Sequence, residues 1–206
     1  MNLQVKQIGY KDCLDLILNV HYAKRVPSIS YAYGLFDDEE MIGIVTYGSP
    51  ASPFLCKGVC GEQFKSEVIE LNRLVLKHNE KNQASYLISK SMKLLPKPKI
   101  IVSYADTAYG HQGKVYQASN FLFTGTTKPR TDMASENGKH SRHSMGDRTK
   151  RVFRSSKHRY VFFVGNQKQK AALLQELRYP ILPYPKGETK RYDAGINVKT
   201  QGMLFV

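Results

Sequence analysis

The segment Ser103-Tyr104-Ala105-Asp106 places polar side chains directly after the apolar residues 100–102. In α/β proteins, ligands bind at the carboxyl ends of buried strands, so this segment is a candidate site. Asp106 is predicted to act as a general base or to orient an amine, and Ser103 to contact a cofactor. The alternative is that Asp106 caps the next helical segment, where a carboxylate accepts backbone N–H groups.

Arg73 lies inside the apolar sequence Glu70-Leu71-Asn72-Arg73-Leu74. A guanidinium in such a strand is costly to bury unless it is paired or faces a cleft. One interpretation is that Arg73 binds a carbonyl or phosphate oxygen of a substrate. The other is a structural ion pair with Glu70 or Asp106.

Two further side chains are candidates for proton transfer. His21 lies near the end of a predicted helix and titrates near neutral pH in an ordinary environment. Tyr116 follows Asp106 on a predicted short helix. The alternatives are that His21 packs or caps, and that Tyr116 is a core aromatic whose hydroxyl finds a buried partner.

The elements that position these residues follow from hydrophobic periodicity and from glycine and proline. Residues 50–61 contain Pro50, Pro53, Gly58 and Gly61 and predict a long loop. Strands are predicted at residues 3–8, 31–36, 41–47, 68–76, 100–105, 121–123 and 159–164, and helices at 13–21, from Asn82 to 95, at 114–120 and at 167–177. The segment from strand 68–76 through the following helix to strand 100–105 should form a right-handed parallel unit. The fold class is therefore α/β, a mixed central sheet flanked by helices.

The formal net charge of +14 is unevenly distributed. Residues 1–127 carry 14 Lys and Arg against 11 Asp and Glu, whereas residues 128–160 carry 10 against 3. A basic stripe indicates a polyanionic partner, since Lys and Arg release counter-ions from phosphates. We expect a single domain with its core at 1–127 and 158–178, a basic insertion at 128–157 before the last core strand, without regular structure, and an irregular tail at 179–206. The predicted nucleic-acid contacts are Lys128, Arg130, Arg142, Arg148, Lys150, Arg151 and Arg154.

The chain lacks a run of eighteen apolar residues and an apolar leader, so a membrane is not expected as a partner. Cys13, Cys56 and Cys60 cannot all pair with one another, which favours a reducing cytoplasm. Cys56 and Cys60 lack the second half of a zinc motif, so no metal site is predicted.

The order of elements resembles that of the GNAT acyltransferases. This resemblance implies that strand 68–76 and the following helix bound an acyl-donor site, that the strand ending at Asp106 splays from its neighbour, and that Tyr116 protonates a leaving group. It also places Asn79, Asn82 and Ser85 at the pyrophosphate loop of the cofactor. That loop lacks the glycines that let backbone amides approach a pyrophosphate.

A narrower resemblance is carried by ordered motifs within residues 20–125. They are His21-Tyr22, Tyr33-Gly34-Leu35-Phe36, Glu70-Leu71-Asn72-Arg73-Leu74, Asn82-x-Ala84-Ser85, Ser103-Tyr104-Ala105-Asp106 and Val115-Tyr116-Gln117-Ala118-Ser119-Asn120-Phe121. This set resembles the Mom family of phage Mu and related phages. The resemblance implies a GNAT-like enzyme of the host cytoplasm that converts adenine N6 in double-stranded DNA to a carbamoylmethyl derivative and so blocks host restriction. It also implies that His21, Arg73, Asp106 and Tyr116 carry the reaction.

The resemblance leaves the donor open between glycyl-tRNA and an acyl-coenzyme A. Simple acyl transfer to N6 gives an amide, whereas the family product has a CH₂ on that nitrogen. A glycyl group that rearranges after transfer accounts for the CH₂, and the glycine-poor loop favours such a donor. Iron has been proposed for the family, but this sequence offers no convincing ligand set.

Two other hypotheses compete with DNA modification. The first is a conventional GNAT acetyltransferase that uses acetyl-coenzyme A on a protein, a tRNA or a small amine. The second is a basic DNA-binding module on an inactive core. The glycine-poor loop argues against the first, and the combination of Arg73, Asp106 and Tyr116 argues against the second.

Overall fold

A computed structural model describes residues 2–133, 151–188 and 203–204. The core is a mixed seven-stranded sheet whose strands lie in the order β1-β2-β3-β4-β5-β9-β6. Its strands are β1 (Leu3–Gln7), β2 (Tyr31–Asp37), β3 (Glu40–Gly48), β4 (Val68–Leu76), β5 (Lys99–Asp106), β6 (Leu122–Thr126) and β9 (Lys157–Val164). All neighbours are antiparallel except β4 and β5, which are parallel. The predicted strands and the predicted parallel unit are therefore confirmed.

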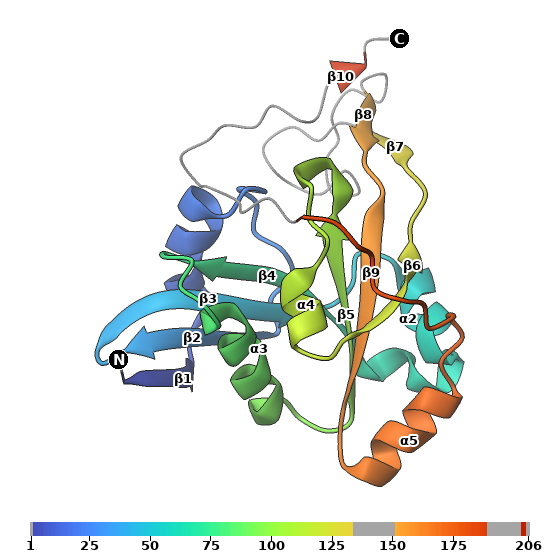
Figure 1. Cartoon of the computed structure of the whole chain (residues 1–206), viewed down its shortest axis with the longest axis horizontal. Coiled ribbons are helices and arrows are strands. Elements are labelled where there is room, and N and C mark those ends of the chain that lie inside the picture. Colours follow the sequence, from blue (N-terminus) through green and yellow to red (C-terminus); the bar gives the residue numbers. More distant parts are fainter. Residues whose placement is uncertain (1, 134–150, 189–202, 205–206) are drawn as a thin grey trace.

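Helices cover both faces of this sheet (Figure 1). Helices α3 (Gln83–Leu94) and α4 (Lys114–Ala118) pack on one face through side chains such as Leu87 and Tyr116. On the other face lie α1 (Tyr10–Asp15), continued by a π-helical turn at Leu16–Val20, and α2 (Pro53–Cys60) with α5 (Gln167–Gln175). Two 3₁₀ turns, Glu62–Glu67 and Thr107–Tyr109, complete the helical elements.

The predicted loop at residues 50–61 is wrong, because most of it is helix α2. Pro53 occupies the first turn of that helix, where its missing N–H costs nothing. Val59 and Cys60 at the end of α2 are fully buried against the sheet. Tertiary burial therefore outweighs the two prolines and two glycines that suggested irregular chain.

The central strands β4 and β5 separate after a short stretch of pairing. β4 and β5 pair only from Val68 opposite Ile100 to Glu70 opposite Val102, although both strands continue beyond this point. At the next step the Ser103 hydroxyl donates a hydrogen bond to the Leu71 carbonyl at 3.0 Å, in place of a backbone ladder bond. The predicted splay of the strand that ends at Asp106 is thus seen in the pairing.

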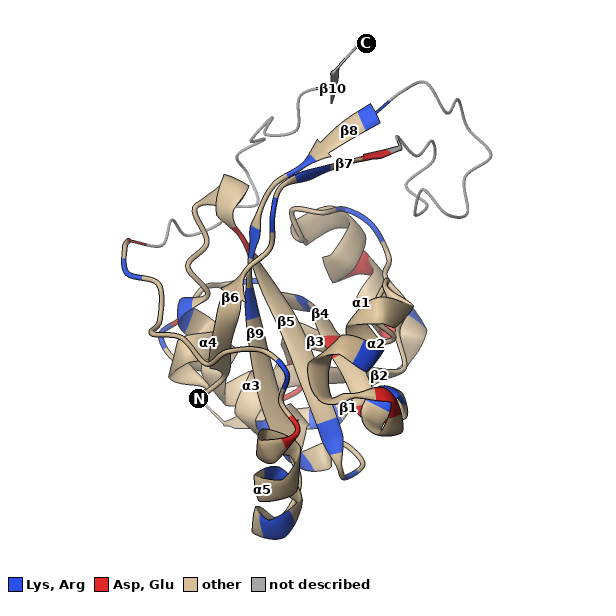
Figure 2. Cartoon of the chain, turned by 90° about the vertical axis from the view of Figure 1, so that its right-hand side faces the viewer, with Lys and Arg blue, Asp and Glu red and all other residues tan. Residues whose placement is uncertain are grey.

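The basic segment contains regular structure where the structure describes it, which corrects the expectation of irregular chain. β7 (Arg130–Met133) pairs with β8 (Arg151–Arg154). β10 (Met203–Leu204), which belongs to the predicted irregular tail, also pairs with β8. We call β7 and β8 together the basic arm. Figure 2 shows the basic arm projecting away from the main sheet as a continuation of β6 and β9. Short polar strands with few apolar residues leave little periodicity to detect.

Among the described residues, no helix combines the length and apolarity needed to cross a bilayer.

Candidate functional site

The site begins with an irregularity in β4. The register between β3 and β4 shifts so that Thr46 lies opposite Arg73 while Tyr47 lies opposite Leu71, which leaves Asn72 as an extra residue. The Asn72 amide accepts a hydrogen bond from the Thr46 hydroxyl at 2.6 Å and donates one to the Ser28 carbonyl at 2.7 Å. A bulge of this kind re-aims the side chains that follow it.

The bulge brings Glu70 and Arg73 to one face of the sheet. Val68, two residues before Glu70, packs with α2 and α5, and Val75, two residues after Arg73, packs with α1. These three helices lie on the same face, whereas residues three apart on a regular strand point to opposite faces. Strict alternation could not have predicted this pairing.

Arg73 is held by backbone carbonyls. Its Nη1 donates to the Asn72 carbonyl at 2.5 Å and its Nη2 to the Arg25 carbonyl at 2.6 Å, and its side chain is 8% exposed. The Nε–H is buried and has no partner among the described residues. Burial lowers the pKa of Arg73, an effect that the nearby Tyr22 and Glu70 oppose. The predicted ion pair with Glu70 or Asp106 is not found in the described part of the chain, because carbonyl groups occupy the two Nη atoms.

His21 follows the π-helical turn and is neutral. Its Nδ1 accepts the Ala23 N–H at 3.0 Å, so the ring proton is assigned to Nε2. Burial, then Arg73 and His111, lower the pKa of His21 to about 3. Its ring stacks on Tyr22 with centroids 4.3 Å apart, and Tyr22 in turn packs on Tyr109 at 4.5 Å. The predicted titration near neutral pH is therefore not supported by this environment.

Asp106 is 2% exposed and already satisfied. It accepts hydrogen bonds from the Ser155 hydroxyl and, at 3.1 Å, from the Ala108 N–H, and its carboxylate lies 2.9 Å from the Lys157 ammonium. Burial favours the protonated acid, but these three donors prevail and lower the pKa of Asp106. The geometry fits the capping alternative, and it also ties the end of β5 to the residues that lead out of the basic arm.

Tyr116 and Ser103 lie on the opposite face of the opened strands. The Tyr116 ring packs against Phe121 at 5.5 Å and Tyr160 at 5.3 Å between centroids. Burial raises the pKa of Tyr116, while a hydrogen bond with Ser103 opposes the rise. Gly113 begins this helix with φ of 67°, and a Cβ there would lie 2.5 Å from the Tyr160 ring. Tyr116 is thus both a core aromatic, as the alternative held, and a hydroxyl directed toward Ser103.

Glu70 is a further candidate for the site, which the sequence predicts only as a partner of Arg73. Burial raises the pKa of Glu70, with Arg73, Lys157 and an Ala51 backbone hydrogen bond acting in the opposite direction. The signal was a carboxylate within an otherwise apolar strand. Glu70 also interacts electrostatically with Tyr104, Tyr116 and Arg25. The surroundings of the splayed strands therefore include a buried carboxyl, a guanidinium and several phenols, with Glu70 and Arg73 on one face of the sheet and Tyr116 on the other.

The first turn of α3 holds the residues predicted to contact a pyrophosphate. Asn82 has φ of 67°, and its carbonyl accepts the Ser85 hydroxyl at 3.0 Å and the Tyr86 N–H at 2.9 Å. Asn79 lies in the exposed loop before the helix. Residues 77–85 contain no glycine, and the pocket beside this turn is lined by the carboxylates of Asp37, Asp38, Glu40 and Glu80. Negative charge here repels a pyrophosphate.

The basic arm carries the predicted nucleic-acid contacts that can be described. Lys128, Arg130 and Arg151 are exposed, whereas Arg154 is partly buried and pairs with Asp132 at 3.3 Å. Arg130 lies 3.5 Å from the same carboxylate with a side chain 70% exposed. Arg142, Arg148 and Lys150 lie outside the described residues. Within the described ranges, no group of three His, Cys, Asp or Glu side chains is arranged to hold a metal ion.

Three comparisons with known proteins agree with this architecture. The chain is 31% identical over 130 residues to the methylcarbamoylase Mom of Escherichia phage Mu, a match that covers 60% of this chain and 54% of that protein. The chain thus matches about half the length of this relative.

Two solved structures share the fold at low sequence identity. They are yncA of Salmonella typhimurium, solved with its cofactor acetyl-CoA (TM-score 0.51, 10% identity, 82% of this chain and 98% of that one), and an Arabidopsis thaliana protein in complex with acetyl-CoA (TM-score 0.50, 14% identity, 79% and 99%). The fold is therefore that of the GNAT acetyltransferases, as expected. The model of the Mom protein family matches residues 2–186, and the chain belongs to that family.

Proposed function

We propose that this protein is a phage transferase that converts the N6 amine of adenine in DNA to a carbamoylmethyl group and so protects the DNA from host restriction in the host cytoplasm. The observation that carries the proposal is the buried Nε–H of Arg73, which has no partner among the described residues and lies near Tyr22 and Glu70. Membership of the Mom family and the name of the phage Mu relative support the substrate.

Arg73 binds the carbonyl oxygen of the group being transferred. Negative charge develops on that oxygen during acyl transfer, and a donor fixed beforehand stabilises it most effectively. One Nη atom of Arg73 is anchored on the Asn72 carbonyl and the other on the Arg25 carbonyl, which holds the Nε–H, unpartnered among the described residues, in a fixed position.

Glu70 accepts the proton that adenine N6 loses as it attacks the carbonyl. The raised pKa of this buried carboxyl makes it a stronger base than an exposed glutamate. Tyr116 protonates the leaving group, and the neutral His21 supports Tyr22 beside it. Asp106 serves by anchoring Ser155 and Lys157, since its oxygens already accept three donors.

The donor that fits best is glycyl-tRNA. The GNAT structures that share the fold bind acetyl-CoA, but the start of α3 has no glycine and adjoins a pocket lined by carboxylates, which does not suit its pyrophosphate. N6 attacks the glycyl ester carbonyl and releases the tRNA hydroxyl, which gives an N6-glycyl amide. The glycyl amine then attacks C6, the C6–N6 bond breaks, and the old N6 becomes the terminal carboxamide. All atoms of the glycyl group are retained, so no oxidant or reductant is needed.

The basic arm delivers the DNA. Adenine N6 is paired in the major groove, so an enzyme that attacks it draws the base out of the helix. The exposed Lys128, Arg130 and Arg151 grip phosphates near the site, because Ser155 and Lys157 at the base of the arm contact Asp106.

Isotope labelling tests the substrate and the donor together. Purified protein is incubated with duplex DNA and glycyl-tRNA labelled with ¹⁵N and ¹³C, and the nucleosides are analysed by mass spectrometry. We expect a modified deoxyadenosine that contains both labels and loses unlabelled ammonia from its carboxamide on fragmentation. Modified deoxyadenosine without the labels, or no modified deoxyadenosine, would refute the donor. Acetylated deoxyadenosine or acetylated protein formed from acetyl-CoA alone would instead establish a conventional acetyltransferase.

A further inference from the structure

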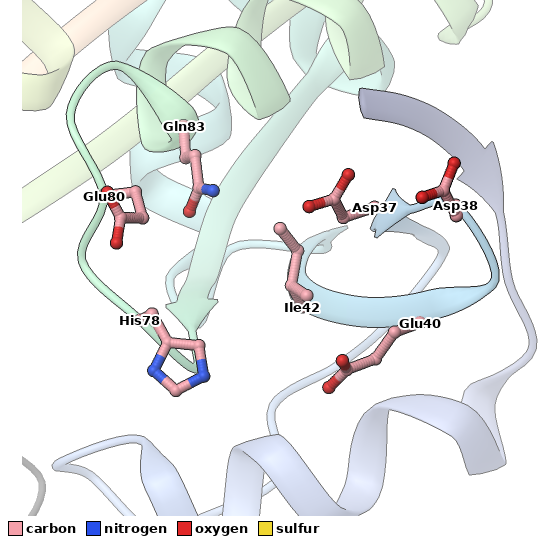
Figure 3. Close-up of a pocket in the computed structure, with 7 residues that line it drawn as sticks. All are labelled: Asp37, Asp38, Glu40, Ile42, His78, Glu80 and Gln83. Carbon is pink, nitrogen blue, oxygen red and sulfur yellow. The ribbon is translucent and has the colours of Figure 1, made fainter. Parts of the chain in front are cut away.

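The pocket at the start of α3 is acidic in a strongly basic protein. It has a volume of about 370 Å³ and lies between the β2–β3 turn and the loop before α3. Four carboxylates line it, from Asp37, Asp38, Glu40 and Glu80, although the chain has a net charge of +14. Figure 3 shows Glu80, His78 and Gln83 on one side of the pocket and Asp37, Asp38 and Glu40 on the other, with Ile42 between them. This size is in the range of pockets that hold small molecules.

The pocket presents acceptors that lack donors. The Gln83 side chain is 3% exposed, lines the pocket, and its Oε1 has no hydrogen-bond partner among the described residues. A buried acceptor without a donor is unfavourable, so a ligand with N–H groups would relieve it. Only part of the carboxylate charge is met from within: Asp37 accepts the Asn2 N–H at 2.9 Å and Glu40 pairs with Lys77 at 2.9 Å.

The spacing of these groups favours an organic cation over a metal ion. In the residues that the structure describes, no three acidic or imidazole side chains converge closely enough to coordinate a metal. Ile42 contributes an apolar wall between the carboxylates, which suits methylene groups. The amino-terminal end of α3 attracts negative charge, but its partial positive charge offsets only a small part of the charge on the four lining carboxylates.

We propose that this pocket binds a linear aliphatic polyamine, with its ammonium groups on the carboxylates, one N–H donated to the Gln83 Oε1, and its methylene chain against Ile42. This inference does not require the proposed function, because none of the pocket residues takes part in the proposed reaction; the two share only the carboxylates that argue against a coenzyme A donor.

The test is calorimetric titration of the full chain with spermidine at low ionic strength. We expect saturable binding of one equivalent. The double variant Asp38→Asn/Glu80→Gln should weaken binding at least tenfold, and Gln83→Met should also weaken it because it removes the buried acceptor. Glu39→Gln is the matched control, since Glu39 lies in the same turn but does not line the pocket, and it should change affinity less than twofold.

Two results would overturn the proposal. One is binding that fails to saturate or that magnesium chloride of equal ionic strength abolishes, which indicates a counter-ion effect only. The other is unchanged affinity in the double variant when thermal melting shows that it is folded. Asp38 and Glu80 are both exposed, so the double variant should fold. Its affinity therefore decides the question even if Gln83→Met does not fold.

Discussion

Arg73 combines two properties that its sequence context made separate alternatives. Its guanidinium is fixed structurally, through the Asn72 and Arg25 carbonyls, and its buried Nε–H has no partner among the described residues. A guanidinium can do both because it has five N–H groups in a rigid fork, whereas an ammonium has three around a single point. The structural role is therefore what makes the remaining Nε–H a positioned donor.

Replacing Arg73 with lysine keeps the charge but removes the fork. We expect Arg73→Lys to lower the rate of adenine modification by about 10²–10³, as loss of a fixed oxyanion donor does. Nucleoside mass spectrometry measures the product. Lys99→Arg alters a basic side chain on β5 that pairs with Glu67 away from the site, and it should leave the rate unchanged. A folded Arg73→Lys protein with full activity contradicts the role.

Glu70 and Asp106 should respond differently to loss of charge. Glu70→Gln removes the proposed base and should abolish modification while the protein still binds DNA. Wild-type activity should fall as the pH is lowered through the raised pKa of Glu70, because the protonated acid cannot accept a proton. Asp106→Asn should instead weaken DNA binding by releasing Ser155 and Lys157. Gel-shift and activity assays on both variants separate the roles, and the reverse pattern would exchange them.

His21 makes a testable contribution to stability. Its pKa is lowered from 6.5 to about 3 in the folded protein, so only the unfolded chain takes up a proton between these values. The stability that it contributes is present above pH 6.5 and is lost as the pH falls toward 3. By pH 5 the loss is about 2 kcal/mol.

Urea unfolding of His21→Asn at pH 7.5 and pH 5 measures this effect. The variant should lose less stability on acidification than the wild-type protein does, by about 2 kcal/mol. His78→Asn is the control, because His78 is exposed and should retain the wild-type pH dependence. Equal pH dependence in His21→Asn and the wild-type protein would show that His21 titrates normally.

At the scale of elements, the bulge in β4 decides the geometry of the site. Asn72 holds the bulge through Thr46 and Ser28, and its own carbonyl receives Nη1 of Arg73. Without the extra residue, Glu70 and Arg73 would point to opposite faces of the sheet. One side-chain amide therefore connects strand register to the position of the reactive groups.

Asn72→Ala should destabilise the protein by about 1–3 kcal/mol, because it leaves buried groups without partners. It should also reduce modification more than tenfold by releasing Arg73. Asn166→Ala is matched to it: Asn166 caps α5 through the Gln169 N–H at 2.8 Å, and its loss costs about 1 kcal/mol. If both variants lose activity in proportion to stability, the bulge has no specific role.

The strands and most helices could be predicted because their apolar residues alternate or recur with the right period. The parallel unit around α3 followed from that order, and the splay of β5 from the resemblance to the GNAT acyltransferases. Helix α2 could not be predicted, because the burial of Val59 and Cys60 outweighs the local propensity of its residues. The carbonyl partners of Arg73 escaped because the backbone groups of Asn72 and Arg25 carry no residue-type signal. The partners of Asp106 escaped because Ser155 and Lys157 are distant in sequence and lie in a polar segment.

At the scale of the whole molecule, the basic arm lies apart from the side chains that are proposed to carry the reaction. The basic arm projects beyond the sheet (Figure 2), while the side chains proposed to carry the reaction belong to the region where β4 and β5 separate. The two regions meet at Asp106, which contacts residues at the base of the arm. Electrostatic attraction thus acts at a distance from the buried groups, whose protonation depends on exclusion of water.

This separation predicts that the basic arm determines the affinity of the protein for DNA but not its preference for a DNA sequence. Replacing Lys128, Arg130 and Arg151 together with glutamine should weaken DNA binding and reduce the slope of log K against log salt by about 2–3, close to one per phosphate contact. Fluorescence anisotropy with two unrelated duplexes between 50 and 200 mM salt measures both effects. Replacing Lys90, Lys93 and Lys97 at the far end of α3 changes the net charge equally, yet the slope should stay near the wild-type value. Equal slopes in the two triple variants would mean that net charge, and not the basic arm, attracts the DNA.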